Sequence, residues 1–532
     1  MQLSVAKYEG CYRFKYGEYS GEPFVLQHER ESHLNLAGFS VAMIAVLLPS
    51  LNAQQPTSHS KQDSAQTSES IQKMIGETFV NGQAYEYDRQ LADEIGPRLT
   101  GSANYMKAAQ WAEQKMQTLG LANVHTESFS VSAWEPDGPA IGNITTPFVH
   151  ELHIYSFPGS PSTPKGGISA KVVHVPGLTR AEMQAVQDSL RGNFALLDRL
   201  SLSPNTTVAG LLQAIPLLEE FGVKGVLVGD ALPAPVGHYE NGIEDPFTST
   251  PDGSMLKVPA AQIGSEDVQL IHRLMERGDV TATFSFKTRI TPNVDVPQVI
   301  GEIRGSQYPD QIVLVGAHLD SWHPGTGAQD NGAGVATVLD VARAMEALHG
   351  GPRRTVRFVL FGGEEQGILG SASYARHHRD EMHKLDAVLI SDTGSGPVLG
   401  WSTLGRNDEQ KSLQTVEPYL HNIGSDRMDN STDLLLDSDH APFVGFGVPA
   451  LLLWTDLTNY WSIHHKASDT FESVSRQNLM QAVVTTAVTA YSIADNEDSF
   501  AKHSSPDEVR TLFQKSGQES DYFFAKRVGL IP

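Results

Sequence analysis

Apolar residues recur at helical spacing in some parts of the chain and form short β-branched runs in others. From Ala103 to Leu119 the apolar positions lie three or four residues apart, which predicts a helix with one apolar face. Further along, short apolar runs alternate with helical stretches, in the order Ile312–Val315, Val335–Met345, Val356–Phe361, Ala387–Ile390, Ala450–Leu453 and Leu479–Tyr491. Strands that alternate with helices predict an α/β fold, in which helices cover both faces of a mostly parallel central sheet.

The region between residues 149 and 290 has a different pattern. Its β-rich runs are short and are separated by Pro/Gly turns and a few helical stretches: Lys171–Val175, Ala195–Leu197, Gly225–Val228 and Val280–Phe286. We therefore predict a β-rich domain inserted at 149–290. The main α/β domain would then consist of two parts, residues 71–148 and residues 291–495.

The two ends of the chain differ from the middle. Residues Leu36–Leu48 form an uncharged apolar run, which has the length of a signal-peptide core and is short for a membrane span. Residues 1–70 are accordingly predicted to be a signal peptide or anchor followed by a polar linker. The mature protein is expected to be exported, periplasmic or secreted, without a stable membrane span. Residues 496–532 are predicted to be a polar tail, whose aromatic residues 522–524 could pack back onto the body.

Composition narrows the possible functions. The chain has 532 residues, of which 40% are hydrophobic and 19% charged, so it can form several folded units. Its net charge of −23 makes nucleic acid and anionic lipid surfaces poor partners. Because Cys11 is the only cysteine in the sequence, any metal site has to use histidine and carboxylate ligands.

Potential metal ligands follow the predicted strands one after another. In chain order they are His318, Asp320, Asp330, Glu364, Glu365, Asp392 and His465. Sheets of this kind bind their ligands beyond the carboxyl ends of the strands, so these side chains are expected to converge. A buried group with this many carboxylates is costly unless cations or partners compensate the charge.

Five of these residues divide into two sets of three ligands that share one carboxylate. The sets are His318, Asp392 and Asp330, and Glu365, His465 and the same Asp330. Imidazole and carboxylate ligands suit zinc, with Co²⁺ or Mn²⁺ as possible substitutes. We therefore predict two Zn²⁺ ions, about 3.5 to 4 Å apart, that activate a water between them.

Glu364 and Asp320 have different predicted roles. Adjacent side chains diverge, so Glu364 cannot easily share the task of Glu365. Glu364 would instead take the proton from the reacting water and pass it to the leaving amine. Asp320 lies two residues after His318 on the same side of an extended segment and would orient the His318 ring.

Three neighbouring residues have weaker assignments. The stretch that contains Asp439 and His440 is interpreted either as a loop cap or as a wall of the substrate pocket. His464 would line the pocket beside His465. The histidines at 377, 378 and 383 lie in a charged helical stretch and are predicted to be solvated.

Five segments together resemble one family of enzymes. They are Gly316-Ala-His-Leu-Asp-Ser321, Asp330-Asn-Gly-Ala-Gly334, Gly363-Glu-Glu-Gln-Gly-Ile-Leu-Gly-Ser371, Ser391-Asp392 and His465-Lys-Ala-Ser-Asp-Thr470. In order and spacing they resemble the co-catalytic zinc exopeptidases, a family that includes bacterial aminopeptidases and glutamate carboxypeptidases, and the resemblance extends over residues 71–495. It implies a phosphorylase/hydrolase-like three-layer αβα sandwich with an inserted protease-associated-type domain. It also implies the ligand, proton-shuttle and supporting roles given above.

The resemblance leaves the preferred end of the substrate open. The segment around His318 and the paired His464 and His465 are most similar to a branch of the family that acts on dipeptides and often forms homodimers. The segment 438–443 is instead closer to the bacterial aminopeptidases. We therefore expect a dizinc exopeptidase that hydrolyses dipeptides or short unblocked peptides with a metal-bridging hydroxide, or alternatively an aminopeptidase. A hypothesis from another class is a receptor-like binding protein on the same fold, but such relatives lose metal ligands, and here all are present.

Overall fold

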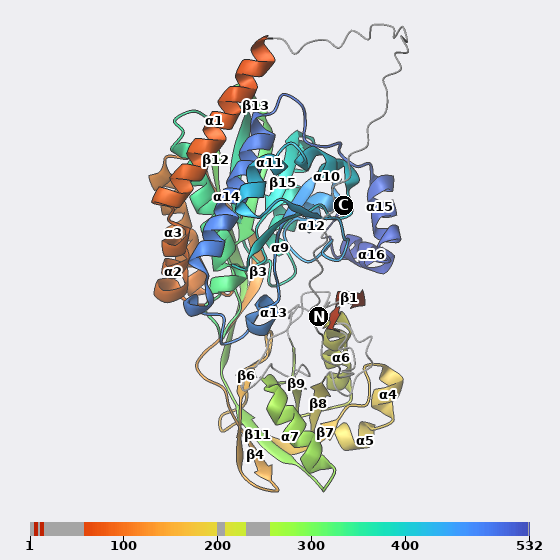
Figure 1. Ribbon diagram of the computed structural model, residues 1–532. Helices are drawn as coiled ribbons and strands as arrows, with labels where there is room; N and C mark the ends of the chain where they lie inside the picture. The colour runs from red at the N-terminus through yellow and green to blue at the C-terminus, as the bar shows by residue number, and fades with distance from the viewer. Residues whose placement is uncertain (1–4, 9–10, 15–57, 199–207, 230–255, 530) are drawn as a thin grey trace, which may run out of the picture.

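The structure is a computed structural model that describes residues 5–8, 11–14, 58–198, 208–229, 256–529 and 531–532. Apart from a short hairpin of β1 (Val5–Tyr8) and β2 (Cys11–Phe14), the described strands form two mixed sheets of eight strands each, one in each of two α/β units (Figure 1). The predicted signal or anchor segment Leu36–Leu48 lies outside the described residues. Among the described helices, none is both long and apolar enough to cross a lipid bilayer.

The main sheet is parallel at its centre and antiparallel toward its edges. Its central strands run in one direction and are β13 (Tyr308–His318), β14 (Arg354–Phe361), β15 (Leu385–Ile390) and β18 (Ala450–Thr455). The outer strands are β3 (Ala122–Pro136), β12 (Thr288–Ile303), β16 (Val398–Ser402) and β17 (Arg427–Asp429). Strand β12 is antiparallel to both β14 and β3, and β16 is antiparallel to β18. The sheet is therefore mixed, because β3 leads into the second unit and β12 returns from it in the opposite direction.

Side chains alternate along the central strands and so build one hydrophobic core on each face of the main sheet. Val313 and Val315 of β13 face the first core, whereas Leu314 faces the second. The first core is covered by α1 (Ser58–Asn81), α2 (Ala84–Arg89), α3 (Ala103–Leu119), α8 (Ala333–Glu346), α10 (Asn407–Leu413), α11 (Glu417–Leu420) and α14 (Arg476–Asp495). The second is covered by α9 (Leu369–His377), α12 (Ala441–Gly445), α15 (Pro506–Lys515) and α16 (Glu519–Val528). The result is a three-layer αβα arrangement.

Helix α3 illustrates how local sequence sets these elements. Ser102 caps the first turn by accepting the N–H of Tyr105, and Gly120 ends the helix in the left-handed conformation. The helix spans the residues that the apolar periodicity predicted. The shorter helical segments of the main unit are α13 (Tyr460–Ile463), η1 (Gln90–Ile95), η2 (Ala328–Gly332), η3 (Arg379–Lys384), η4 (His421–Ile423) and η5 (Phe471–Ser473).

The second unit lies between β3 and β12 in the sequence and below the main unit in Figure 1. Its strands are, in sheet order, β5 (His150–Leu152), β4 (Ile141–Thr146), β11 (Thr281–Ser285), β7 (Ile168–His174), β8 (Phe194–Asp198), β9 (Gly225–Gly229), β10 (Ala260–Ile263) and β6 (Ile154–Ser156). One face of this sheet packs against α7 (Ser265–Met275), and the other against α4 (Arg180–Gln184), α5 (Gln187–Leu190) and α6 (Val208–Glu220). The sheet begins at Ile141, earlier than the boundary at residue 149 that the sequence predicted.

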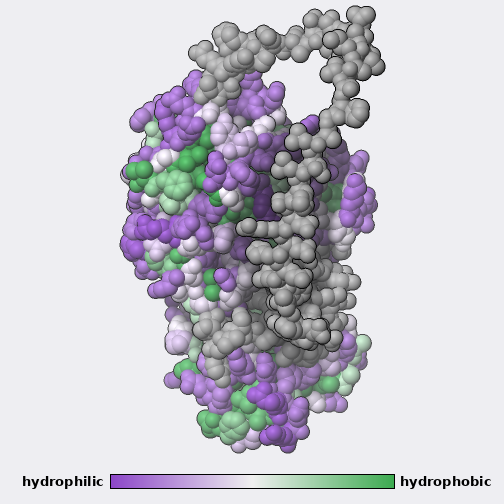
Figure 2. All heavy atoms as spheres, viewed as in Figure 1, coloured by the Kyte–Doolittle hydropathy of each residue, from purple (hydrophilic) through white to green (hydrophobic). Residues whose placement is uncertain are grey.

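Exposed apolar residues gather at the end of the second unit that is far from the main unit. Figure 2 shows this region in green below a mostly hydrophilic surface. Ile141, Phe148 and Val149, which flank or belong to β4, are 58%, 48% and 78% exposed. The first and last of these apolar side chains are thus more than half exposed to solvent.

The C-terminal segment is part of the folded body. Residues 496–532 were expected to be a polar tail, but α15 and α16 contribute Val509, Phe513, Tyr522 and Ala525 to the second core. The polar composition concealed this because the apolar positions of α15 lie on one face of an otherwise charged helix.

Phe513 and Phe523 give a matched test of this packing. The side chain of Phe513 is fully buried and that of Phe523 is 50% exposed. Phe513→Ala should lower the free energy of unfolding by about 3 to 5 kcal/mol, because it leaves a cavity in the second core. Phe523→Ala should cost less than about 1 kcal/mol. Urea unfolding of both variants measures the difference, and equal losses would contradict the packing.

Candidate active site

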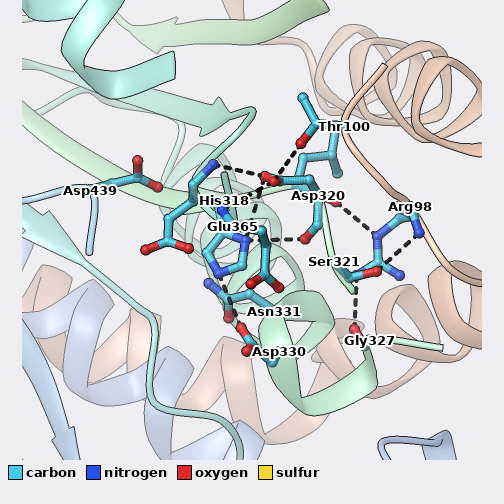
Figure 3. Close-up of polar contacts among 12 residues, drawn as sticks. Arg98, Thr100, His318, Asp320, Ser321, Gly327, Asp330, Asn331, Glu365 and Asp439 are labelled. Carbon is cyan, nitrogen blue, oxygen red and sulfur yellow. Dashed lines mark hydrogen bonds and ion pairs between the residues drawn. The ribbon is translucent and has the colours of Figure 1, made fainter. Parts of the chain in front are cut away.

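Side chains from distant parts of the sequence meet at the carboxyl edge of the central parallel strands (Figure 3). His318 is the last residue of β13, the glutamates 364 and 365 follow β14, and Asp392 follows β15. Asp330 lies in η2 just before α8, and His465 follows α13. The parallel direction of β13, β14 and β15 brings these loops to one edge of the sheet.

The carboxylate of Asp330 lies between two histidines. Its Oδ1 is 3.1 Å from Nε2 of His318, and its Oδ2 is 3.0 Å from Nε2 of His465. The same nitrogen of His318 is 3.1 Å from Oδ1 of Asp392, and that of His465 is 2.7 Å from Oε2 of Glu365. The structure thus brings together both predicted ligand sets, with Asp330 in common.

His464 lies closer to this cluster than its predicted place on the pocket wall. Its Nε2 is 3.1 Å from Oδ2 of Asp330, and its ring stacks on that of His465 with centroids 3.6 Å apart. The second set is therefore formed by Asp330 and His465 with two neighbours, Glu365 and His464. The sequence could not choose between the adjacent histidines, because both lie in one loop.

Asp320 holds three parts of the site in place. The Nδ1 of His318 lies 3.1 Å from the carbonyl oxygen of Asp320 and 3.6 Å from its carboxylate, which leaves Nε2 directed at the cluster. The two carboxylate oxygens of Asp320 accept the backbone N–H groups of Glu364 and Glu365, each at 3.3 Å, and one also accepts the hydroxyl of Thr100 at 2.7 Å. One buried aspartate thereby fixes both the ring of His318 and the start of the glutamate loop.

Asp469 supports Asp330 in a similar way. Its carboxylate oxygens accept the N–H groups of Gln329 at 2.7 Å and of Asp330 at 3.1 Å. Asn331 anchors the other side, because its side chain donates to the carbonyl of Ser391 and accepts the N–H of Gly334. The resemblance motifs include these residues, but the sequence alone assigned no role to Asp469 or Asn331.

Arg98 is a further structural residue that the sequence analysis missed. Its guanidinium is buried and donates to the carbonyl oxygens of Leu319, Thr326 and Gly327, each at 2.8 Å. It therefore ties the loop between His318 and Asp330 to the segment before α3, as Figure 3 shows. A charged residue within an otherwise apolar turn was the available signal, but its partners lie more than two hundred residues away.

Asp439 and His440 have different surroundings. Asp439 is buried, accepts a hydrogen bond from the hydroxyl of Ser371, and has a second buried oxygen, Oδ2, without a hydrogen-bond partner. In Figure 3 it lies on the opposite side of His318 from Arg98. His440 instead contacts the carbonyl of Leu434 through Nε2 at 2.6 Å and is not part of the ligand cluster. Of the solvated histidines predicted nearby, His378 is partly buried and contacts Glu127 at 3.0 Å.

Burial and mutual repulsion act strongly on the carboxyl groups of the site. Burial raises the pKa of Glu365 well above its usual value, and the charge of Asp330 raises it further. Burial likewise raises the pKa of Glu364 well above its usual value, and Asp392 adds to this. Burial raises the pKa of Asp439 to about 7. These carboxyl groups cannot all ionise together unless additional positive charge lies among them.

The donor set fits divalent metal ions. Each predicted set offers one imidazole nitrogen and carboxylate oxygens within a buried pocket, and the raised pKa values indicate that the pocket favours cations. Nitrogen and oxygen donors of this kind suit Zn²⁺. His318, Asp330 and Asp392 would hold one ion, and Asp330, His465 and Glu365 or His464 the other.

Comparison with known proteins agrees with this geometry. The model of peptidase family M28 matches residues 298–491, a range that includes every ligand of both sets. Carboxypeptidase Q of Rattus norvegicus is 30% identical over 437 residues, which cover 81% of this chain and 90% of that protein.

Solved structures share the fold. The peptidase M28 precursor from Shewanella amazonensis SB2B is similar with a TM-score of 0.71 and 27% identity, over 83% of this chain and 100% of that chain. A zinc aminopeptidase from Bacillus subtilis is similar with a TM-score of 0.59 and 23% identity, over 79% of this chain and 96% of that chain. At this identity the second likeness concerns the fold alone.

The support that Asp469 gives to Asp330 can be tested by Asp469→Asn. The amide NH₂ would face one of the two backbone N–H groups that the carboxylate now accepts, so Asp330 should shift. We expect the affinity for Zn²⁺ to fall about 10- to 100-fold, as for other residues that orient metal ligands. Competition with a chromophoric chelator measures the affinity.

The matched control is Asp456→Asn, which changes an exposed aspartate that caps Thr458 after β18. This variant should bind Zn²⁺ like the wild type. Equal affinities in all three proteins would remove Asp469 from the support of the site.

Proposed function

The chain belongs to peptidase family M28 and is a metallopeptidase, and from this premise we propose that it is a dizinc exopeptidase acting on dipeptides or short unblocked peptides. The observation that carries the proposal is the position of Asp330, whose two carboxylate oxygens face His318 and His465 separately. A carboxylate shared in this way supplies one ligand to each of two ions and reduces their repulsion. Similarity to carboxypeptidase Q supports the choice of a dipeptide or short peptide as the substrate.

The residues around the two ligand sets have separate tasks in hydrolysis. Bound zinc ions would polarise the scissile carbonyl and lower the pKa of water, which is the chemistry they supply in such sites. Glu364, held by its backbone N–H on Asp320 and partly exposed at the mouth of the site, takes a proton from the attacking water. It then returns this proton to the nitrogen of the leaving amine as the amide C–N bond breaks.

The electrostatics of Glu364 agree with this role. Burial and nearby carboxylates raise its pKa well above the usual value. Positive charge in the neighbouring ligand sets acts in the opposite direction, so the carboxyl group can titrate near neutral pH. A group with such a pKa can both accept and release a proton within one cycle.

A receptor-like binding protein on the same fold is the hypothesis from another class. Such a protein needs no complete ligand set and no proton acceptor. Here His318, Asp392, Glu365 and His465 all surround Asp330. This argues for catalysis and against a role in binding alone.

A free α-amino group is the substrate feature that the site is best suited to bind. Asp439 has a carboxylate oxygen without a hydrogen-bond partner, and its charge is close enough to Asp392 and His318 to interact with them. By contrast, Arg98 and Lys466 donate to backbone carbonyls. A free amine is common to dipeptides and to aminopeptidase substrates, so aminopeptidase activity remains the alternative.

Three further features stay predictions. The position of the second unit between β3 and β12 supports a protease-associated-type domain. Export to the periplasm or secretion follows from the apolar run near the start of the sequence, and a homodimer follows from the family resemblance. N-terminal sequencing of the mature protein and its molar mass in solution would test the last two.

Glu364→Gln tests the proton transfer. The amide cannot accept the proton of water, so kcat should fall by about 10²- to 10⁴-fold on a free dipeptide. Both ions should stay bound, because Glu364 belongs to neither ligand set. Steady-state kinetics and elemental analysis of the same preparation measure the two effects.

Gln366→Ala serves as the control two residues away and should keep both the rate and the metal content. Chelation of the wild type should abolish hydrolysis, which a receptor-like protein would never show. Near-normal turnover of Glu364→Gln would refute the proposed mechanism.

Asp439→Asn tests recognition of the free amine. Loss of one charge-assisted hydrogen bond costs about 1.5 to 3 kcal/mol, so the KM for a free dipeptide should rise roughly 10- to 100-fold. An N-blocked dipeptide, which has no ammonium group, should be a poor substrate for both proteins and should show no such difference. An aminoacyl-nitroanilide, assayed beside them, distinguishes an aminopeptidase from an enzyme that also needs the free carboxylate.

A further inference from the structure

A second group of metal-type ligands lies in the second unit, away from the catalytic edge. It consists of His174, Asp198 and His272. His174 is the last residue of β7, Asp198 is the last residue of β8, and His272 lies on α7 (Figure 1). Within the part of the chain that the structure describes, this is the one group of three such ligands outside the catalytic site.

The fold of the second unit explains why these three side chains meet. Strands β7 and β8 are adjacent and parallel, with His174 opposite Leu196, so their carboxyl ends lie at one edge of the sheet. Side chains two residues apart share a face, so His174 lies on the face of Val172, and Asp198 on the face of Leu196. That face packs against α7 through Val268 and Ile271.

The last residue of β9 allows α7 to approach closely. A Cβ atom on Gly229 would lie 2.3 Å from Cγ2 of Val268 and 3.2 Å from Cβ of Asp198. Glycine is therefore required here if α7 is to keep its place against the strand ends. His272, one turn after Val268, is held beside Asp198 as a result.

The donor atoms have the proximity that a single cation requires. One donor atom from each residue lies within 4.8 Å of the other two, and Nε2 of His272 is 2.9 Å from Oδ2 of Asp198. The rings of His174 and His272 meet edge to face with centroids 5.3 Å apart. Asp198 is only 1% exposed, so its charge needs a partner within the protein.

An ion pair between His272 and Asp198 is the simpler explanation for part of this arrangement. It accounts for the buried carboxylate and for a histidine near the end of a helix. It leaves Nε2 of His174, which is buried and has no hydrogen-bond partner. A cation bound to all three residues accounts for this nitrogen as well, because a buried polar atom without a partner is costly.

We propose that His174, Asp198 and His272 bind one divalent cation of the zinc class and so join the ends of β7 and β8 to α7. Two imidazoles and one carboxylate suit Zn²⁺, whereas Ca²⁺ and Mg²⁺ prefer oxygen donors. The cation stabilises the second unit, since binding to the folded state alone raises the free energy of unfolding. This site is separate from the catalytic ligands, and the inference does not depend on the proposed function.

His174→Gln is the decisive variant, because it removes the unpaired nitrogen and leaves the contact between Asp198 and His272 intact. The full-length protein is stripped of metal with a chelator and dialysed against Zn²⁺, and the bound ions are counted by elemental analysis. The wild type should bind one ion more per chain than His174→Gln or Asp198→Asn. Zn²⁺ should also raise the melting temperature of the wild type more than that of either variant.

His150→Gln is the matched control in the same unit. His150 also contacts a buried aspartate of α7, with Nε2 3.0 Å from Oδ1 of Asp267, but belongs to no group of three ligands. This variant should bind as many ions as the wild type. Because the test compares counts between variants, it is independent of how many ions the catalytic site holds.

Equal zinc content in the wild type and in folded His174→Gln, checked by circular dichroism, would overturn the inference. Loss of an ion in Asp198→Asn but not in His174→Gln would overturn it too, since the ion would then not use all three ligands. Weak binding that persists equally in every variant would assign the extra ion to the protein surface, with the same consequence.

Discussion

The position of one carboxylate, that of Asp330, is the constraint on which the rest of the site depends. Its two oxygens lie 3.1 Å and 3.0 Å from nitrogens of His318 and His465, which come from opposite ends of the main unit's sequence. A single shared oxygen pair couples the two ligand sets, so a small shift of Asp330 would change both. Such a residue has to be immobile, and the surrounding structure can be understood as the means of holding it. Burial alone would raise the pKa of Asp330, but the contacts with His318, His464 and His465 lower it well below its usual value, so the group stays ionised.

The residues that hold the ligands are themselves buried and polar. Asp320 accepts N–H groups from both glutamates, and Asp469 accepts those of Gln329 and Asp330. Each buried aspartate is therefore satisfied by backbone donors of a neighbouring loop, which fixes the loop and compensates the charge. Arg98 acts in the opposite sense, since its donors satisfy carbonyl oxygens of the loop that leads from His318 to Asp330. The active-site loops thus fold around three buried charged side chains, none of which belongs to the two predicted ligand sets.

The sequence predicted the elements and the ligands better than it predicted these supports. Periodicity located α3 and the four central strands, because one core on each face of the sheet requires alternating apolar residues. Strand ends then pointed to the ligands through the rule for parallel sheets. The partners of Arg98 and Asp469 could not be found in this way, because hydrogen bonds to the backbone carry no sequence signature in the partner. For the same reason the pattern could not separate His464 from His465, and the charged surface of α15 concealed its packing against the core.

The two units apply the same rule at different edges. In the main unit the parallel strands β13, β14 and β15 direct their carboxyl ends, and the polar residues that follow them, to one place. In the second unit β7 and β8 do the same with His174 and Asp198, and α7 supplies the third side chain. The alternation of side chains decides which face these residues share, so the same residues moved by one position would point into the opposite core. Parallel pairing therefore supplies the convergence, and the parity of the strand residue decides whether a polar side chain at the strand end meets a partner.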